Sequence, residues 1–134
     1  MIETVLQSIG CLPKPSLAER PILSVEQASE LQDLFKVLAN DTRLRLLHAL
    51  ARSEEMHVTE LCNALGMRPQ AVSNQLQRLS NRGILTSRRK GNWVYYRMAD
   101  PCVPMVLEYG LCLAEDSKER KRADNGKRRK GERQ

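Results

Sequence analysis

Acidic residues are missing from a long internal stretch of this 134-residue chain, because no Asp or Glu lies between Glu60 and Asp100. The absence excludes a carboxylate-based active site in that stretch. Seven cationic residues remain there without local compensation, and a surface of one sign favours contact with a polyanion. These residues are Arg68, Arg78, Arg82, Arg88, Arg89, Lys90 and Arg97.

Other absences narrow the class of protein. No run of about 18 apolar residues is present, so we expect no membrane span, and the start Met1–Thr4 lacks the basic and apolar parts of a signal peptide. We therefore expect a cytoplasmic protein. The chain has no Gly-rich phosphate loop, no His-Glu-x-x-His and no carboxylate pair beside a histidine, so we do not expect an enzyme. Aromatic residues make up only 4%, which favours a mainly helical domain over an aromatic-rich β-barrel.

The length predicts one domain with extensions at both ends. Residues 1–21 are expected to form a partly ordered arm, because Pro13 and Pro15 interrupt any helix. Residues 22–117 would form the folded domain. Residues 118–134 contain nine Lys/Arg and three Asp/Glu, which accounts for the whole net charge of +6. We expect this tail to be disordered and to act as a solubilising or nonspecific DNA-attracting extension.

Two amphipathic helices are predicted before the acid-free stretch. The first begins after Ser24, which with Gln27 resembles a capping box, and ends near Ala39. The second runs from Thr42 to Arg52, with Asn40 or Asp41 as its cap. In this second helix, Leu44, Leu47 and Leu50 are expected to point the same way.

The acid-free stretch itself has the pattern of a winged helix-turn-helix. Helices are predicted over His57–Leu65 and Pro69–Asn81, with Gly66 in the turn that joins them. Two β-rich runs follow, at 84–87 and 93–98, around a basic tip at 88–92, which is typical of a hairpin. The fold class predicted is therefore mainly α with a β-hairpin wing.

A last helix is predicted from Asp100, its cap, to about Ser117, with Pro101 and Pro104 in the first turn. Its apolar residues cover more than one face, which is too much for a helix lying alone on a small domain. We therefore expect a homodimer in which this helix contacts a second subunit. The residues are Val103, Val106, Leu107, Leu111, Leu113 and Ala114.

The second helix of such a motif enters the major groove, and its N-terminal residues meet the base edges. Here the candidates for base contact are Arg68, Gln70, Ser73, Asn74 and Gln77. Arg78 lies further along, nearer to phosphates, and Arg88, Arg89 and Lys90 of the wing would reach the backbone or minor groove. Two alternatives are a solvated basic face and a protein–protein interaction module. The coincidence of missing acids, a polar helix face and a basic hairpin favours DNA.

Several motifs together resemble the ArsR/SmtB family of bacterial repressors over residues 25–117. They are Leu38–Leu47, Thr59-Glu60-Leu61, Leu65-Gly66, Ala71–Leu79 and Gly91–Tyr96. The resemblance implies a homodimer paired through its first and last helices. It also implies an operator with inverted repeats, released when a metal, metalloid or oxidant reaches the cysteines. Some members carry Cys-Val-Cys where this chain has His57-Val58-Thr59, so both thiolates of that version of the metal site are absent here.

The four cysteines are not expected to form structural disulfides in a cytosolic protein. Cys62 shares an apolar stripe and is expected to be buried. The resemblance places Cys102, with Asp100, at the first ligand pair of an inter-subunit site on the last helix. The family's second pair maps onto Leu113 and Asp116, with Cys112 nearby, so the correspondence is partial.

Cys102 and Cys112 are ten residues apart, which separates them by ~80° around a helix and ~15 Å along it. They cannot meet within one helix, but antiparallel packing in a dimer could bring Cys102 of one subunit to Cys112 of the other. Cys11 could add a third thiolate or act as a redox partner. Such ligands suit As(III), Cd(II), Pb(II), Hg(II) or Zn(II). Two alternatives stay open, namely thiol-redox sensing of an oxidant or sulfide, and simple packing of the cysteines.

Overall fold

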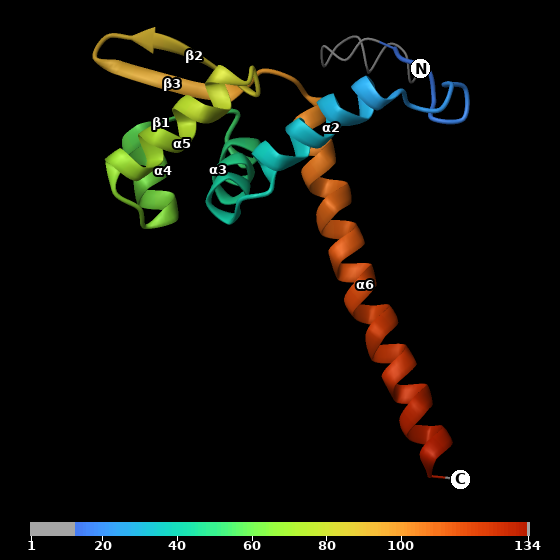
Figure 1. Ribbon diagram of the computed structural model, residues 1–134. Helices are drawn as coiled ribbons and strands as arrows, with labels where there is room; N and C mark the ends of the chain where they lie inside the picture. Colours follow the sequence, from blue (N-terminus) through green and yellow to red (C-terminus); the bar gives the residue numbers. More distant parts are fainter. Residues whose placement is uncertain (1–12, 134) are drawn as a thin grey trace. The chain divides into compact units, whose positions relative to one another are not determined.

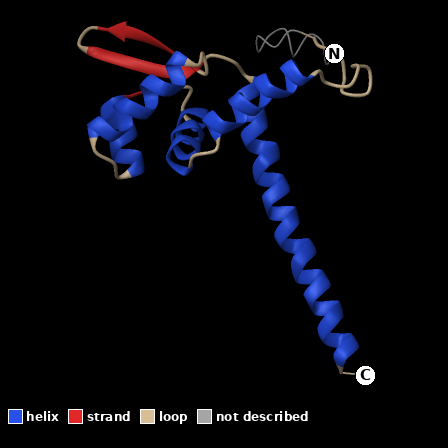
Figure 2. Cartoon of the chain, in the orientation of Figure 1, coloured by secondary structure: helices blue, strands red, loops and turns tan. Residues whose placement is uncertain are grey.

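The computed structural model describes residues 13–133, so Cys11 and the start of the predicted arm lie outside it. The elements follow the order α2 (Val25–Leu38), α3 (Asp41–Arg52), β1 (Glu55–His57), α4 (Val58–Leu65), α5 (Pro69–Asn81), β2 (Leu85–Lys90), β3 (Trp93–Met98) and α6 (Cys102–Glu132) (Figure 1). The chain divides into two compact units between Pro104 and Met105. Helices and a small sheet form the first unit, and the second is helical (Figure 2).

The first two helices begin where the sequence predicts. The Ser24 hydroxyl accepts a hydrogen bond of 3.1 Å from the Gln27 amide, and the Gln27 side chain accepts one of 3.0 Å from the Ser24 amide. This reciprocal pair satisfies two backbone donors at the start of α2. Asn40, rather than Asp41, caps α3, because its side-chain oxygen accepts from the amide of Arg43 at 3.1 Å.

The core of the first unit is made mostly of leucines from α3, α4 and α5. Six side chains have no exposed area, and they are Leu46, Leu47, Leu61, Val72, Leu76 and Leu79. The prediction that Leu44 would point with Leu47 and Leu50 is wrong, because Leu44 is 40% exposed and Leu46 is buried instead. At about 100° per residue, Leu46, Leu50 and Leu47 share an arc of about 100° and Leu44 falls about 60° beyond it.

A glycine makes the sharp turn between α4 and α5 possible. Gly66 has a φ of 65°, in the left-handed region that a side chain disfavours, and its amide donates to the carbonyl of Cys62. Pro69 stands in the first turn of α5, where no backbone partner is lost. The predicted pair of helices is therefore confirmed, and α5 has the predicted bounds.

The sheet has a third strand that the sequence analysis missed. The strands lie in the order β1-β3-β2, all antiparallel, with His57 of β1 opposite Tyr95 of β3. A run of three residues is too short to give a recognisable alternation, and only its middle residue, Met56, is buried. The wing, defined here as β2, β3 and the turn between them, is thus joined to β1 as well as closed on itself (Figure 1).

The tip of the wing is shorter than predicted. Gly91 and Asn92 alone connect the strands, and Gly91 takes a φ of 63°. Arg88, Arg89 and Lys90 were expected at the tip, but they belong to β2, where Lys90 pairs with Trp93. A two-residue turn with positive φ matches the twist of a hairpin, so the strands continue up to it.

The prediction that the last helix ends near Ser117 is wrong, because α6 continues to Glu132. The segment after Ser117 is rich in Lys, Arg and Glu, which favour helix, and Arg128 and Asp124 form an i,i+4 pair at 3.5 Å. The predicted cap is supported, since Asp100 accepts from the amide of Cys102 at 2.8 Å. Within the described residues, no helix is both long and apolar enough to cross a membrane.

The contrast between two leucines of α3 gives a test of the core. Leu46→Ala should lower the free energy of unfolding by about 2–5 kcal/mol, because it leaves a cavity in a fully buried site. Leu44→Ala, the control on the same helix, should cost about 1 kcal/mol or less, because that side chain is already part-exposed. Urea denaturation at one protein concentration measures both. Equal losses would place Leu44 in the core.

Candidate nucleic-acid interface and thiol sites

The outward side of α5 carries the polar residues that the sequence singled out. Arg68, Gln70, Asn74, Gln77 and Arg78 are exposed, and Ser73 is half-buried. The opposite side of the helix is fully buried through Val72, Leu76 and Leu79. This two-sided burial fixes how far α5 can rotate about its own axis, so the same side chains always face outward.

The amide side chains on this face are held in pairs. Gln70 donates to the side-chain oxygen of Asn74 at 3.1 Å, and Gln77 donates to that of Asn81 at 3.0 Å. Each pair spans one helical turn, which is the spacing at which side chains meet. The pairing restricts the rotamers of Gln70 and Asn74 and leaves each with further donor or acceptor capacity.

The two helices of the motif differ at their N-termini. In α4, His57 accepts from the amide of Glu60 at 3.3 Å and the Glu60 carboxylate accepts from the amide of His57. In α5, by contrast, Arg68 makes no side-chain cap and the first turn has no acidic residue. The amides at the start of α5 and the helix dipole are thus open to an anion.

Arg43 is a positioning residue that the sequence analysis missed. Its Nε donates to the Gln75 side chain of α5 at 2.8 Å, and a terminal nitrogen donates to the carbonyl of Val37 at 2.7 Å. The guanidinium therefore ties α5 to the end of α2. Nothing in the local pattern of α3 distinguishes Arg43 from Arg45, because its partner lies 32 residues away.

The three basic residues of the wing have different surroundings. Arg89 and Lys90 are exposed and take part in no ion pair within the described part of the chain. Arg88, in contrast, is bound to the carboxylate of Glu55 in β1 through two nitrogens. The hydrogen bond from Arg88 lowers the pKa of Glu55 below its usual value, and the same bond raises the pKa of Arg88. The sequence analysis missed Glu55 entirely.

The cysteines of the first unit lie in two settings. Cys62 is half-buried in α4, less deeply than predicted, and Cys102 is exposed at the start of α6. Hydrogen bonds from Cys102 lower the pKa of Asp100, the one from its backbone amide more than the one from its thiol. The positive charge of Lys14 lowers this pKa by a smaller amount. Cys102 and Asp100 are thus close together, as the resemblance implies.

Cys112 belongs to the second unit and is exposed on α6. Its sulfur lies 3.7 Å from a carboxylate oxygen of Asp116, one turn further along. The negative charge of Asp116 raises the pKa of the Cys112 thiol, and Glu115 and Glu108 act in the same direction. The thiol form is therefore favoured over the thiolate in the isolated chain.

No three His, Cys, Asp or Glu side chains gather into a possible metal site within residues 13–133 of a single chain. The candidate ligands Cys102 and Cys112 each lie beside a carboxylate, Asp100 and Asp116 respectively. Their sulfur and oxygen donors suit a thiophilic ion, but a complete donor set needs more residues than one described chain brings together.

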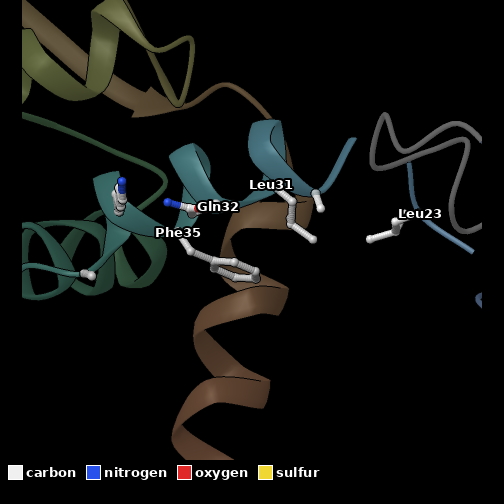
Figure 3. A pocket seen from close by; sticks show the side chains of 7 residues that line it. Leu23, Leu31, Gln32 and Phe35 are labelled. Carbon is white, nitrogen blue, oxygen red and sulfur yellow. The ribbon is translucent and has the colours of Figure 1, made fainter. Parts of the chain in front are cut away.

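An apolar groove of about 440 Å³ runs along α2. Leu31 and Phe35 line it one turn apart, and they are 40% and 50% exposed (Figure 3). These side chains lie on the apolar side of a helix predicted to be amphipathic, yet only Leu38 of α2 is buried. The helix therefore presents an uncovered apolar face in the single chain.

Comparison with known proteins finds a matching family model and several similar transcriptional regulators. Residues 40–92 match the family model described as the MarR family. The chain is 48% identical over 75 residues to the arsenic resistance transcriptional regulator ArsR1 of Pseudomonas putida. These 75 residues are 56% of this chain and 58% of the relative. The chain is 39% identical over 71 residues to the arsenical resistance operon repressor of Escherichia coli, covering 53% and 60%. The chain thus spans about three fifths of the length of these curated relatives.

Solved structures match over more of their length. The antimony-specific transcriptional repressor AntR is 58% identical, with a TM-score of 0.69, over 82% of this chain and 99% of that one. A homodimeric winged helix-turn-helix domain from Mycobacterium bovis, a possible ArsR-family regulator, is 31% identical with a TM-score of 0.60. That match covers 72% of this chain and 92% of the other.

The surroundings of Cys112 predict a change in thiol reactivity. Asp116→Asn removes the nearest negative charge, so the pKa of Cys112 should fall and alkylation by iodoacetamide at mildly alkaline pH should speed up, because the thiolate is the nucleophile. Peptide mapping by mass spectrometry follows each cysteine, and Cys62 serves as the internal control. Unchanged alkylation of Cys112 would mean that Asp116 does not control its ionisation.

Proposed function

Since the chain belongs to the ArsR/SmtB family of winged helix-turn-helix transcriptional regulators, we propose that it is a homodimeric DNA-binding repressor. Its operator would be released when a soft metal or metalloid ion binds the cysteines. The family is one of regulators rather than enzymes. The ion, the ligands and the operator contacts are parts of the proposal.

One observation carries the DNA-binding part, namely the two-sided character of α5. Its apolar side is completely buried, and its exposed side offers Arg68, Gln70 and Asn74 in a stretch without any acid. Arginine can bind guanine, and asparagine or glutamine can bind adenine, through two hydrogen bonds each. A solvated helix face needs neither this choice of side chains nor the absence of acids.

The wing and the start of α5 would hold the protein on the duplex without reading sequence. Arg89 and Lys90 would contact phosphates, and the uncapped amides at the start of α5 would donate hydrogen bonds to another phosphate. In a dimer, two copies of α5 would enter successive major grooves, which are about 10–10.5 base pairs apart. An operator with inverted repeats follows from the two-fold symmetry of such a dimer.

The dimer would cover the apolar face of α2. Leu31 and Phe35 are 40% and 50% exposed in the single chain, and the exposed Tyr109 and Leu113, one turn apart on α6, present a second apolar surface. Exposed apolar patches of this kind mark association sites. Each copy would bury both surfaces against its partner, in agreement with the homodimeric state of the M. bovis domain.

Cys102 and Cys112 are the proposed ligands of the inducing ion, with Cys11 as a candidate third. Because a single described chain gathers no complete donor set, the thiols would come from both copies of the dimer. When bound, a soft ion would supply strong bonds to the thiolates, which must first lose their protons. Arsenic, antimony and cadmium are named for relatives of this chain, so As(III), Sb(III) and Cd(II) are the first ions to test.

Asn74→Ala should weaken binding to a duplex selected in vitro by about 1–3 kcal/mol, because a two-bond contact to a base is lost. Binding to a random-sequence duplex should change little. Asn63→Ala is the matched control, an exposed asparagine on α4. Fluorescence anisotropy measures the affinity of the unchanged protein and of both variants for each of the two duplexes. An equal loss on both duplexes would assign Asn74 to phosphate contact or to packing rather than to readout.

Cys102→Ser and Cys112→Ser should each retain DNA affinity and lose release by arsenite, antimony(III) or Cd(II), because each removes a proposed ligand. Cys62→Ala, on another helix, should remain inducible. Release is followed by anisotropy, and bound metal by elemental analysis of the same samples. A Cys102→Ser protein that still releases DNA and still binds the ion would move the site elsewhere.

A further inference from the structure

We propose that Glu55 and Arg88 are positioning residues that hold the wing at a fixed angle to α4, and that Arg88 does not contact DNA. The first part concerns the protein alone, whereas the second rests on the proposed function. The sequence grouped Arg88 with Arg89 and Lys90, but the structure separates it from them.

The contact between Glu55 and Arg88 has the geometry of a strong ion pair. Nε of Arg88 donates to one carboxylate oxygen of Glu55 at 2.9 Å, and a terminal nitrogen donates to the other oxygen. Two parallel bonds fix the orientation of both groups, unlike a single contact between flexible chains. Occupying both carboxylate oxygens also commits the Nε edge of the guanidinium, which is one of the edges that can bind a phosphate through two hydrogen bonds.

The pair spans the whole width of the sheet. Arg88 of β2 stands opposite Tyr95 of β3, whose other neighbour is His57 of β1. Glu55 lies two residues before His57 and therefore on the same face of the sheet. To reach it, Arg88 crosses the central strand with its guanidinium 5.3 Å from the centre of the Tyr95 ring. The edge strand of the wing is thus bound directly to β1.

Strand β1 leads without a loop into the helix-turn-helix. His57 ends β1 and caps α4, and its ring lies 4.3 Å from that of Trp93 and 5.4 Å from that of Tyr95. Its Nε2 is 3.0 Å from the Glu60 carboxylate in the first turn of α4. One face of the sheet therefore links the outer strand of the wing, across β3, to the start of α4.

Strand β2 needs such a link because it pairs with β3 alone, whereas β3 also pairs with β1. Beyond the buried Leu85, its residues Thr86 to Lys90 are exposed, so packing against the core does not hold this end of the strand. Successive residues of a strand point to opposite faces, so Arg89 lies on the face opposite to Arg88. With Arg88 bound to Glu55, the phosphate contacts of the wing fall to Arg89 and Lys90.

The Glu55–Arg88 ion pair is called the brace below. Measuring how the affinity for a short random-sequence duplex depends on salt concentration distinguishes a brace from a phosphate contact by Arg88. Glu55→Gln and Arg88→Gln should each weaken binding by about two- to fivefold, as expected for one exposed pair, and leave the salt slope unchanged. The double variant should be no worse than either single one. Arg89→Gln, the adjacent control, should flatten the slope by about 0.9 for each wing on the duplex, and thus by about 1.8 for the dimer. The exchange E55R/R88E should restore affinity.

A direct contact between Arg88 and a phosphate would give a different set of results. If Arg88 contacts a phosphate, Arg88→Gln flattens the slope as Arg89→Gln does, Glu55→Gln leaves affinity unchanged or raises it, and the exchange rescues nothing. That outcome overturns the second part of the proposal.

Trp93, the only tryptophan of the chain, tests the brace without DNA. Its ring packs on His57, so a loosened wing should expose it further, and acrylamide should quench its fluorescence more strongly in Glu55→Gln and Arg88→Gln. Arg89→Gln and the exchange should behave like the unchanged protein. Equal quenching in all variants overturns the brace. If the unchanged protein fails to bind duplex but this pattern holds, the proposed function is wrong and the brace stands.

Discussion

The burial of Val72, Leu76 and Leu79 is the constraint on which the rest of this structure depends. All three have no exposed area, so α5 can present only one side to a partner. That side holds polar residues that can read bases, and the surrounding stretch contains no acid that would repel a phosphate. Core packing therefore does more than stabilise the domain, because it also selects which residues would meet the duplex in the proposed complex.

A second requirement is that the wing keeps a fixed relation to α5. The two elements are separate in sequence, and each would contact a different part of the duplex. Arg43 binds α5 to the preceding helices, and β1 joins the wing to α4 through His57. Hydrogen bonds and strand pairing thus connect the leucine core to the strands of the wing, so the proposed function requires these contacts to keep α5 and the wing in register.

Much of this could be predicted from the sequence, because the signals are local. Pro69, Gly66 and the spacing of Val72, Leu76 and Leu79 define α5 and its turn, and the resemblance to the ArsR/SmtB family is confirmed by the comparisons. What was missed depends on distant partners or short runs. Glu55 gains its role only from Arg88, 33 residues away, and β1 has too few residues to show a period. The tail was judged by charge and low hydrophobicity, although Lys, Arg and Glu also favour a helix.

The most direct test of the central claim is guanine N7 methylation interference on a duplex selected in vitro by the purified protein. Major-groove readout by two copies of α5 predicts two patches of interference, centred about 10–10.5 base pairs apart on one side of the helix. The patches should disappear with Arg68→Ala, because arginine is the side chain of α5 that can bind guanine through its N7 and O6 atoms. A single patch, or no interference from methyl groups in the major groove, would contradict the account.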